Sequence, residues 1–332
     1  MLSPPVDLDV ALLHAALNRV WDLDLDSLTY IPLGFGSHHW NAIEKRGQRW
    51  FVTVDDLRTG RLGGDPDVAF GAYAAAFGTA AALRDRGLDF VLAPLGNRDG
   101  AVLTRLDFNY SLALFPYVDG VSADFGVYRS ERDRHDVLRL LGRLHATPPP
   151  LELSRREDFS VPKRDLLITA LSEVGTPWTS GPFAEPTRQL LRATADNLRT
   201  ALAHYDDLVA EVRGESSSWV VTHGEPHAAN VIRLGEDRLL LIDWDTVAIG
   251  PRERDLWMVV EDAASDLAPY SGAGGVPERS ATAMALYRLW WELADIAEYV
   301  SIFRRPHQRG GNEEASWRYL SRSLPIRAEL LR

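Results

Sequence analysis

Residues 217–255 constrain the fold of this chain more than any other part of the sequence. The apolar runs in this segment are short, and polar or charged residues follow each of them at once. Short apolar runs bounded by turn residues predict strands rather than helices. Glu225, Asn230 and Asp243 then lie on loops at strand ends, where a rigid scaffold usually holds reactive groups. The two predicted strands that frame these loops are Trp219–Thr222 and Leu239–Ile242.

The same segment favours magnesium over zinc. Its two histidines are four residues apart, which is a zinc-binding spacing when both lie on one helical face. The glycine and the proline between them disfavour a helix there. Glu225, Asn230 and Asp243 are hard oxygen donors, which suit a magnesium ion that carries substrate phosphates. One carboxylate is then left over to accept a proton.

The sequence HGEPHAAN, followed by LIDWDT, resembles the catalytic loop and metal-binding segment of the aminoglycoside phosphotransferase family, which is related to protein kinases. In that family the usual pattern is HGDxHxxN and then IDW with an acidic residue. The resemblance implies that Glu225 is the catalytic base and that Asn230 and Asp243 bind Mg²⁺. Asp255, in PRERDLW, is a further landmark of the family. The residues expected to support the catalytic loop are His223, His227 and Asp245.

Two of these positions leave a question open. Glu225 stands where the family has an aspartate, and the extra methylene moves the carboxylate outward by roughly 1.5 Å. Because a misplacement of about 1 Å can cost about a hundredfold in rate, either the backbone or the acceptor compensates, or activity is low. Asp245 either supports the metal from behind its ligands or pairs with an arginine such as Arg252 or Arg254.

The resemblance implies an α+β, bilobal protein-kinase-like fold. A small β-rich N-lobe, residues 1–118, would bind the nucleotide, and a larger, mainly helical C-lobe, residues 119–332, would hold the catalytic loop and the substrate site. The N-terminal sequence predicts a helix over 9–21, strands over Trp40–Glu44 and Arg49–Val54, and a hairpin from Leu88–Pro94 and Ala101–Leu106.

A glycine turn, Gly34-Phe35-Gly36-Ser37, precedes the first of these strands. In a kinase N-lobe such a turn covers the nucleotide phosphates with backbone N–H groups. Gly34, Gly36 and Ser37 are therefore expected at the nucleotide, although the same glycines also fit an ordinary hairpin. Pro116, Tyr117 and Val118 follow a further apolar strand, at the place where the hinge of a kinase-like fold meets the purine.

Thr53 is the largest departure from the family pattern. It stands where the family has a lysine that holds the α- and β-phosphates and pairs with a glutamate on the next helix. The helix predicted for Asp67–Arg86 contains no glutamate. Since both partners are missing together, the sequence predicts a reorganised phosphate site near Thr53. Arg58, Arg61 or Lys45 could supply the positive charge, and spacing does not choose among them.

A long helix predicted for Arg279–Phe303 is the expected site of the acceptor. In the family, acidic residues of the C-terminal helices bind the amines of the antibiotic. A solvated acidic face and ordinary core packing would explain the same residues. Upstream, His145 closes the helix predicted for Glu131–Ala146 and is interpreted as structural. The residues expected at the substrate are Trp291, Glu292, Asp295, Glu298 and Tyr299.

Composition narrows the partners and the compartment. The 332-residue chain carries 47 acidic and 36 basic residues, a net charge of −11, which argues against nucleic-acid binding and favours a cationic small molecule. It has no cysteine, its N-terminal segment does not read as a signal peptide, and no apolar run reaches the ~20 residues that span a bilayer. We therefore expect no membrane partner and a cytoplasmic location.

Together these features predict a Mg²⁺-dependent O-phosphotransferase. It would move the γ-phosphate of ATP or GTP to a hydroxyl of an antibiotic-like molecule, an aminoglycoside or aminocyclitol, and so give resistance. The chain length and its C-terminal segment resemble spectinomycin-type members most. The alternatives are a nucleoside-antibiotic kinase, a housekeeping small-molecule kinase, and a nucleotide-binding pseudokinase without transfer activity.

Overall fold

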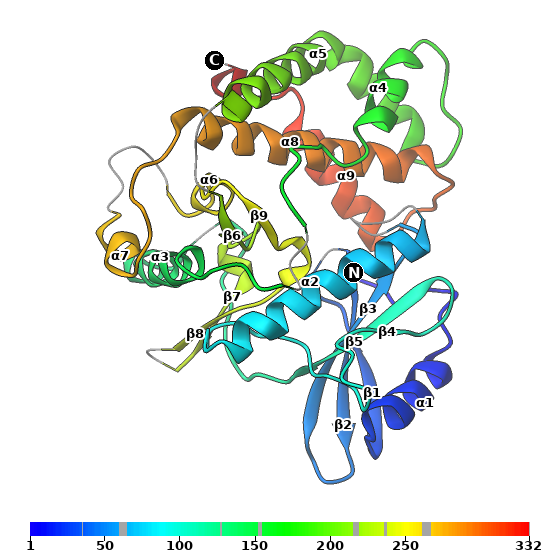
Figure 1. The fold of residues 1–332 in the computed structure, drawn as a ribbon. Helices are drawn as coiled ribbons and strands as arrows, with labels where there is room; N and C mark the ends of the chain where they lie inside the picture. The colour runs from blue at the N-terminus through cyan, green and yellow to red at the C-terminus, as the bar shows by residue number, and fades with distance from the viewer. Residues whose placement is uncertain are drawn as a thin grey trace. The chain divides into compact units, whose positions relative to one another are not determined.

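A five-stranded antiparallel sheet with the strand order β1-β2-β3-β5-β4 forms the N-terminal part of the structure, a computed structural model (Figure 1). The structure describes residues 1–34, 36–59, 65–126, 128–151, 155–214, 219–235, 238–260 and 267–331. The strands are β1 Leu25–Ile31, β2 His38–Glu44, β3 Arg49–Asp56, β4 Thr104–Arg105 and β5 Tyr110–Pro116.

Helices cover both faces of this sheet. Helix α1, Val10–Trp21, is capped by the side chain of Asp9 and packs its leucines on Val52, Val54 and other residues of one face. Helix α2, Pro66–Asp85, packs on Ala113 of β5. Because side chains alternate between the faces of a strand, α1 and α2 lie on opposite faces. The predicted N-terminal sheet and its two helices are confirmed.

The predicted hairpin of Leu88–Pro94 with Ala101–Leu106 is wrong. Val91 forms a parallel bridge to Leu241, and the backbone of Leu241 exchanges hydrogen bonds with Phe90 and Leu92. On the other side, β4 pairs with β5. The turn between the two segments does form, since the Oδ1 atom of Asn97 accepts hydrogen bonds from two backbone N–H groups that follow it. The turn signal was therefore correct, but its flanks pair with other parts of the chain.

The segment after Trp219 folds as the sequence predicts, into short strands joined by polar loops. Strand β6 pairs with β9, and β7 forms a hairpin with β8. Helices α3 and α7 of the same unit pack together. The elements of this region are α3 Glu131–His145, β6 Val220–Thr222, η1 Ala228–Asn230, β7 Val231–Leu234, β8 Arg238–Leu241, η2 Trp244–Thr246, β9 Ala248–Gly250, α6 Glu253–Leu256 and α7 Ala268–Gly272.

The chain divides into two units by its internal contacts. Unit 1 comprises Met1–Glu157 and Trp219–Glu278, and unit 2 comprises Asp158–Ser218 and Arg279–Arg332. The catalytic segment thus groups with the N-terminal sheet. Unit 2 consists of helices, among which α5 and α8 pack together. Its elements are α4 Arg164–Ser172, α5 Ala184–Gly214, α8 Ala281–Arg304, α9 Gly311–Ser323 and η3 Ala328–Leu331. Within the described ranges, every helix is too short or too polar to cross a membrane.

Candidate active site

Asp255 holds the start of the predicted catalytic loop. Its carboxylate is fully buried and accepts hydrogen bonds from the backbone N–H groups of His223, at 2.8 Å, and Gly224, at 2.6 Å. A third bond, of 2.9 Å, comes from Nε2 of His145. Burial alone would raise the pKa of Asp255, but the hydrogen bond and charge of His145 outweigh it and lower the pKa. The structural role expected for His145 is confirmed, because its other ring nitrogen contacts Tyr270.

Gly224 is enclosed so closely that no other residue fits. Its φ is +103°, and an added Cβ would lie 2.5 Å from a guanidinium nitrogen of Arg254 and 2.6 Å from the hydroxyl of Thr246. Arg254 is itself buried, donates to the hydroxyl of Thr222 and the carbonyl of Thr246, and pairs with Glu157 at 2.8 Å. The buried groups behind Gly224 therefore restrict the conformation of the loop.

His223 joins the catalytic loop to the predicted metal-binding segment. Burial lowers its pKa to about 4, so the ring is neutral. Its Nε2 atom lies 2.9 Å from the carbonyl of Ile242 and must carry the proton, since a carbonyl only accepts. Its Nδ1 atom then accepts from the backbone N–H of Glu225, at 3.2 Å. The ring of Trp244 packs edge-on against the imidazole, with 4.6 Å between centroids.

Asn230 and Asp243, the expected metal ligands, are joined through the backbone. The side-chain Nδ2 of Asn230 donates to the backbone carbonyl of Glu225, at 3.0 Å. The backbone carbonyl of Asn230 accepts from the backbone N–H of Ile242, at 3.0 Å. The first bond turns the Oδ1 atom to the other side of the amide, which suits a metal ligand. Asp243 has the left-handed backbone conformation, φ 66°, and such costly conformations persist mainly at functional sites.

The donor set fits magnesium. Among the described residues, no three histidine, cysteine, aspartate or glutamate side chains form a metal-holding cluster. One amide oxygen and one carboxylate are instead the small protein contribution that Mg²⁺ usually receives when substrate phosphates and water complete its octahedron.

The other residues expected to support the loop contact it or lie beside it. The ring of His227 packs edge-on against Phe125, at 4.7 Å between centroids, and Tyr128 donates to the carbonyl of Pro226, at 2.6 Å. Arg252 and Arg254 bind backbone carbonyls and Glu157. The charge of Asp245 also acts on a buried carboxylate of β3, Asp55, whose pKa it raises.

Asp55 is a site residue that the sequence reasoning missed. It is 2% exposed on β3, where its carboxylate accepts a 2.5 Å hydrogen bond from the hydroxyl of Ser37 in the glycine turn. Burial raises its pKa to about 7, against the effect of that hydrogen bond and with a further rise from Asp245. The available signal was a carboxylate directly after the apolar residues of a predicted strand, at Val54-Asp55. Gly34 and Gly36, on the same turn, have φ values of 72° and 92°, which explains why they are glycines.

Two of the three charged residues proposed to replace the missing lysine are engaged elsewhere. Arg58 binds both carboxylate oxygens of Asp56 and pairs with Asp7, at 3.0 Å. Lys45 pairs with Asp24, at 2.7 Å. Arg61 lies outside the described residues. Neither Arg58 nor Lys45 therefore supplies a free positive charge beside Thr53.

The expected hinge, Pro116–Val118, lies between two contacts within unit 1, one to β3 and one to β7. Strand β5 ends at Pro116, and the guanidinium of Arg49 stacks 3.5 Å from the ring centre of Tyr117. Val118 is half-buried. Three residues later, Val121 exchanges backbone hydrogen bonds with Arg233 of β7. The segment thus connects the sheet to the hairpin that precedes Asp243.

The residues expected at the acceptor all belong to α8, in unit 2. Glu298 pairs with Lys163, which neutralises part of this acidic face. Burial raises the pKa of Glu292, and Arg327 lies 3.6 Å from its carboxylate. Tyr299 stacks on a second tyrosine, with 6.1 Å between centroids. The helix brings these residues together with Trp291 and Asp295, and their role at a substrate stays a prediction.

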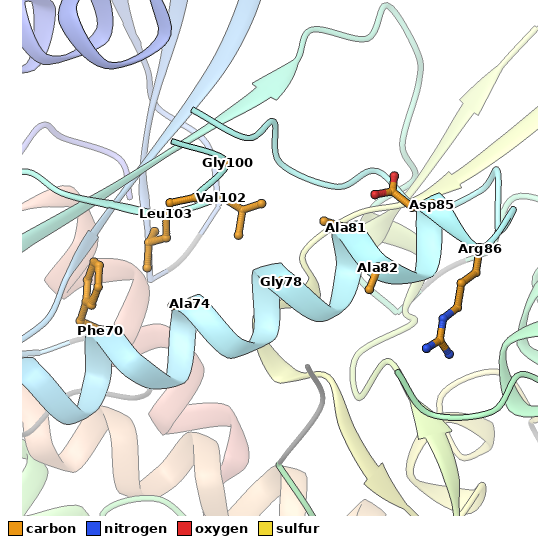
Figure 2. A pocket seen from close by; sticks show the side chains of 11 residues that line it. Phe70, Ala74, Gly78, Ala81, Ala82, Asp85, Arg86, Gly100, Val102 and Leu103 are labelled. Carbon is orange, nitrogen blue, oxygen red and sulfur yellow. The ribbon is translucent and has the colours of Figure 1, made fainter. Parts of the chain in front are cut away.

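A separate cavity of about 660 Å³ lies beside α2 (Figure 2). Its wall consists mainly of alanine and glycine residues of α2 and of the segment Gly100–Leu103, with Phe70, Asp85 and Arg86 at its edges. None of the residues predicted at the nucleotide, metal or acceptor lines it. We therefore do not include it in the candidate active site.

Glu225 follows β6, Asn230 precedes β7 and Asp243 follows β8, in the order expected of a kinase-like phosphotransferase. The chain belongs to the phosphotransferase enzyme family (APH), whose sequence profile matches residues 29–289. It is thus a kinase that transfers phosphate to hydroxyl acceptors, with a nucleotide and a small molecule as substrates.

Comparisons with individual proteins agree with this class. The chain is 29% identical to protein StrN of Streptomyces griseus over 316 residues, which cover 92% of this chain and 88% of StrN. The structure of spectinomycin phosphotransferase APH(9)-Ia with ADP and spectinomycin is similar, with a TM-score of 0.75, 15% identity and coverage of 98% and 97%. Choline kinase LicA of Streptococcus pneumoniae gives a TM-score of 0.59, 13% identity and coverage of 95% and 98%. These structural likenesses confirm the predicted kinase-like fold.

Proposed function

We propose that this enzyme moves the γ-phosphate of ATP or GTP, with Mg²⁺, to a hydroxyl of a small antibiotic-like molecule of the aminoglycoside or aminocyclitol class, and that this modification gives resistance. The observation that supports transfer most directly is the backbone link between Asn230 and Ile242, which sets the spacing of the two expected metal ligands. A protein that bound nucleotide without Mg²⁺ would have little reason to keep both Asn230 and Asp243. We also propose that residues 1–118 and 119–332 act as the nucleotide and acceptor lobes of a cytoplasmic enzyme.

The chemistry assigned to the chain is positioning and proton transfer. Phosphoryl transfer leaves little covalent work to the protein. Asn230 and Asp243 would hold Mg²⁺, which neutralises phosphate charge when it is bound. Glu225 would orient the acceptor hydroxyl and take its proton. Its carbonyl is fixed by Asn230 and its N–H by His223, so the added side-chain length projects from a rigid backbone.

The class of acceptor rests on charge. The chain has a net charge of −11, and α8 presents Glu292, Asp295 and Glu298, of which Glu298 is paired with Lys163. These carboxylates support an amine-bearing acceptor. The comparison enzyme with the higher TM-score carries spectinomycin, an aminocyclitol, in its structure. The similarity to a choline kinase keeps a housekeeping kinase for a cationic alcohol as the second candidate.

The test is a panel of aminocyclitol, aminoglycoside and nucleoside antibiotics and choline, incubated with γ-labelled ATP or GTP. We expect label on an amine-bearing antibiotic. Asp243→Ala should abolish labelling, whereas the matched control Asp196→Ala, at a fully exposed carboxylate of α5, should not change it. Transfer by Asp243→Ala at the wild-type rate would refute the metal assignment. Nucleotide binding without any transfer, unaffected by Mg²⁺, would support a pseudokinase instead.

A further inference from the structure

His39 lies directly beside Thr53, the position at which the family pattern has a lysine. The two residues are directly opposite each other on the antiparallel strands β2 and β3. The Nδ1 atom of His39 lies 3.3 Å from the hydroxyl of Thr53, and its ring packs on Phe51 of the same face, with 4.9 Å between centroids. The imidazole is therefore held in place by the strand that would otherwise carry the lysine.

The free edge of this ring faces the glycine turn. A Cβ added at Gly34 would lie 3.7 Å from the Nε2 atom of His39. The same turn is tied to β3 by the hydrogen bond from Ser37 to Asp55. His39 is half-buried. A nucleotide whose phosphates lie under the turn would therefore meet Nε2 first on this side.

No other described cation takes that place. Arg58 and Lys45 are bound to carboxylates elsewhere. The amino group of Met1 reaches the same turn, but it donates to the carbonyls of Leu33, Gly34 and Ser37. These three hydrogen bonds direct the N–H groups of Met1 to the backbone of the turn rather than to a phosphate. An imidazole remains as the donor.

We propose that His39, oriented by the hydroxyl of Thr53, is the phosphate-binding residue of the N-terminal sheet and donates from Nε2 to the diphosphate part of the nucleotide. This inference rests on the proposed nucleotide site and identifies what replaces the missing lysine. Burial lowers the pKa of His39 to about 3, so the ring is neutral in the free protein. In the tautomer that we propose, the Thr53 hydroxyl donates to Nδ1 and the ring proton is on Nε2. The contact is a hydrogen bond rather than a full ion pair.

The test compares dissociation constants for adenosine, ADP and ATP, or for the guanine series if that binds more tightly. We expect His39→Ala to weaken the diphosphate and triphosphate about tenfold to a hundredfold, which is the usual loss for a hydrogen bond to a charged group. Adenosine should change less than twofold. Thr53→Val should reproduce part of the loss and Thr53→Ser should not. His14→Ala, on α1 at the opposite face of the sheet, is the matched control.

Two outcomes would overturn the proposal: an unchanged affinity of His39→Ala for ADP, or an equal loss for adenosine and ADP. If His39→Ala melts at a lower temperature than wild type, the double variant Thr53→Lys/His39→Ala decides. A lysine at the family position should restore diphosphate affinity, and failure to restore it in a folded protein would count against the assignment. Absence of nucleotide binding in the wild-type protein would instead refute the proposed function itself.

Discussion

The substitution Asp55→Asn should make the protein more stable at neutral and alkaline pH. Asp55 is 2% exposed, and burial raises its pKa to about 7 from an ordinary value of 3.8. Asparagine has the same shape and keeps an oxygen that can accept the hydrogen bond from Ser37. It cannot ionise. The variant therefore removes the pH-dependent cost of holding a charge inside the sheet, while its NH₂ group takes the place of the Oδ2 atom, which is buried without a hydrogen-bond partner among the described residues.

The magnitude follows from the two pKa values. Below pH 4 the carboxyl is protonated in the folded and unfolded states, so ionisation contributes nothing. Between pH 4 and pH 7 the unfolded state releases the proton while the folded state keeps it, so the free energy of unfolding falls as pH rises. At 1.36 kcal/mol per pH unit, the cost reaches about 4 kcal/mol above pH 7. Between pH 5 and pH 8 the wild type should lose about 3 kcal/mol relative to the variant.

The assay is urea unfolding of both proteins at pH 5 and pH 8 without nucleotide or metal. Any change in packing caused by the amide is common to both conditions and cancels in the comparison. Asp26→Asn, at an exposed aspartate of β1, is the control and should show no such pH-dependent difference. If the difference in stability between wild type and Asp55→Asn were the same at pH 5 and pH 8, the raised pKa of Asp55 would be wrong.

Other predictions concern the catalytic loop and its surroundings. Asp255→Asn should lower kcat and reduce the free energy of unfolding by about 3 kcal/mol, because a buried charged acceptor is lost; a normal kcat in a destabilised protein would contradict this. Glu225→Gln should abolish transfer but leave the nucleotide dissociation constant within twofold, as calorimetry can check, and Glu225→Asp should retain measurable transfer. Ser130→Ala should cost about 1 kcal/mol in urea unfolding without changing KM, because the hydroxyl caps α3 by accepting from Asp133.

The sequence predicted what depends on local pattern. The helix expected over 131–146 is α3, and the long C-terminal helix is α8. The order and spacing of Glu225, Asn230 and Asp243 were enough to predict the family, which the comparison confirms. Such features are readable because periodicity, caps and motif spacing act within a few residues of one another.

What the sequence did not predict depends on pairing between distant segments. Val91 lies beside Leu241, some 150 residues along the chain, and no local signal distinguishes that bridge from a hairpin. The contact of His39 with Thr53 depends on strand register, which a one-residue slip would reverse. Asp55 is an ionisable residue that a propensity argument places at the surface, yet it is buried and accepts a hydrogen bond from Ser37 of the glycine turn.

The hydrogen bond between the backbones of Asn230 and Ile242 has a consequence for how such an enzyme can diversify. It ties the spacing of the two expected ion ligands to the main chain and not to the fit of nearby side chains. Mutations that change acceptor recognition can accumulate elsewhere while the spacing of the two expected ion ligands stays the same. A scaffold of this kind can change its preferred alcohol without rebuilding its reaction centre.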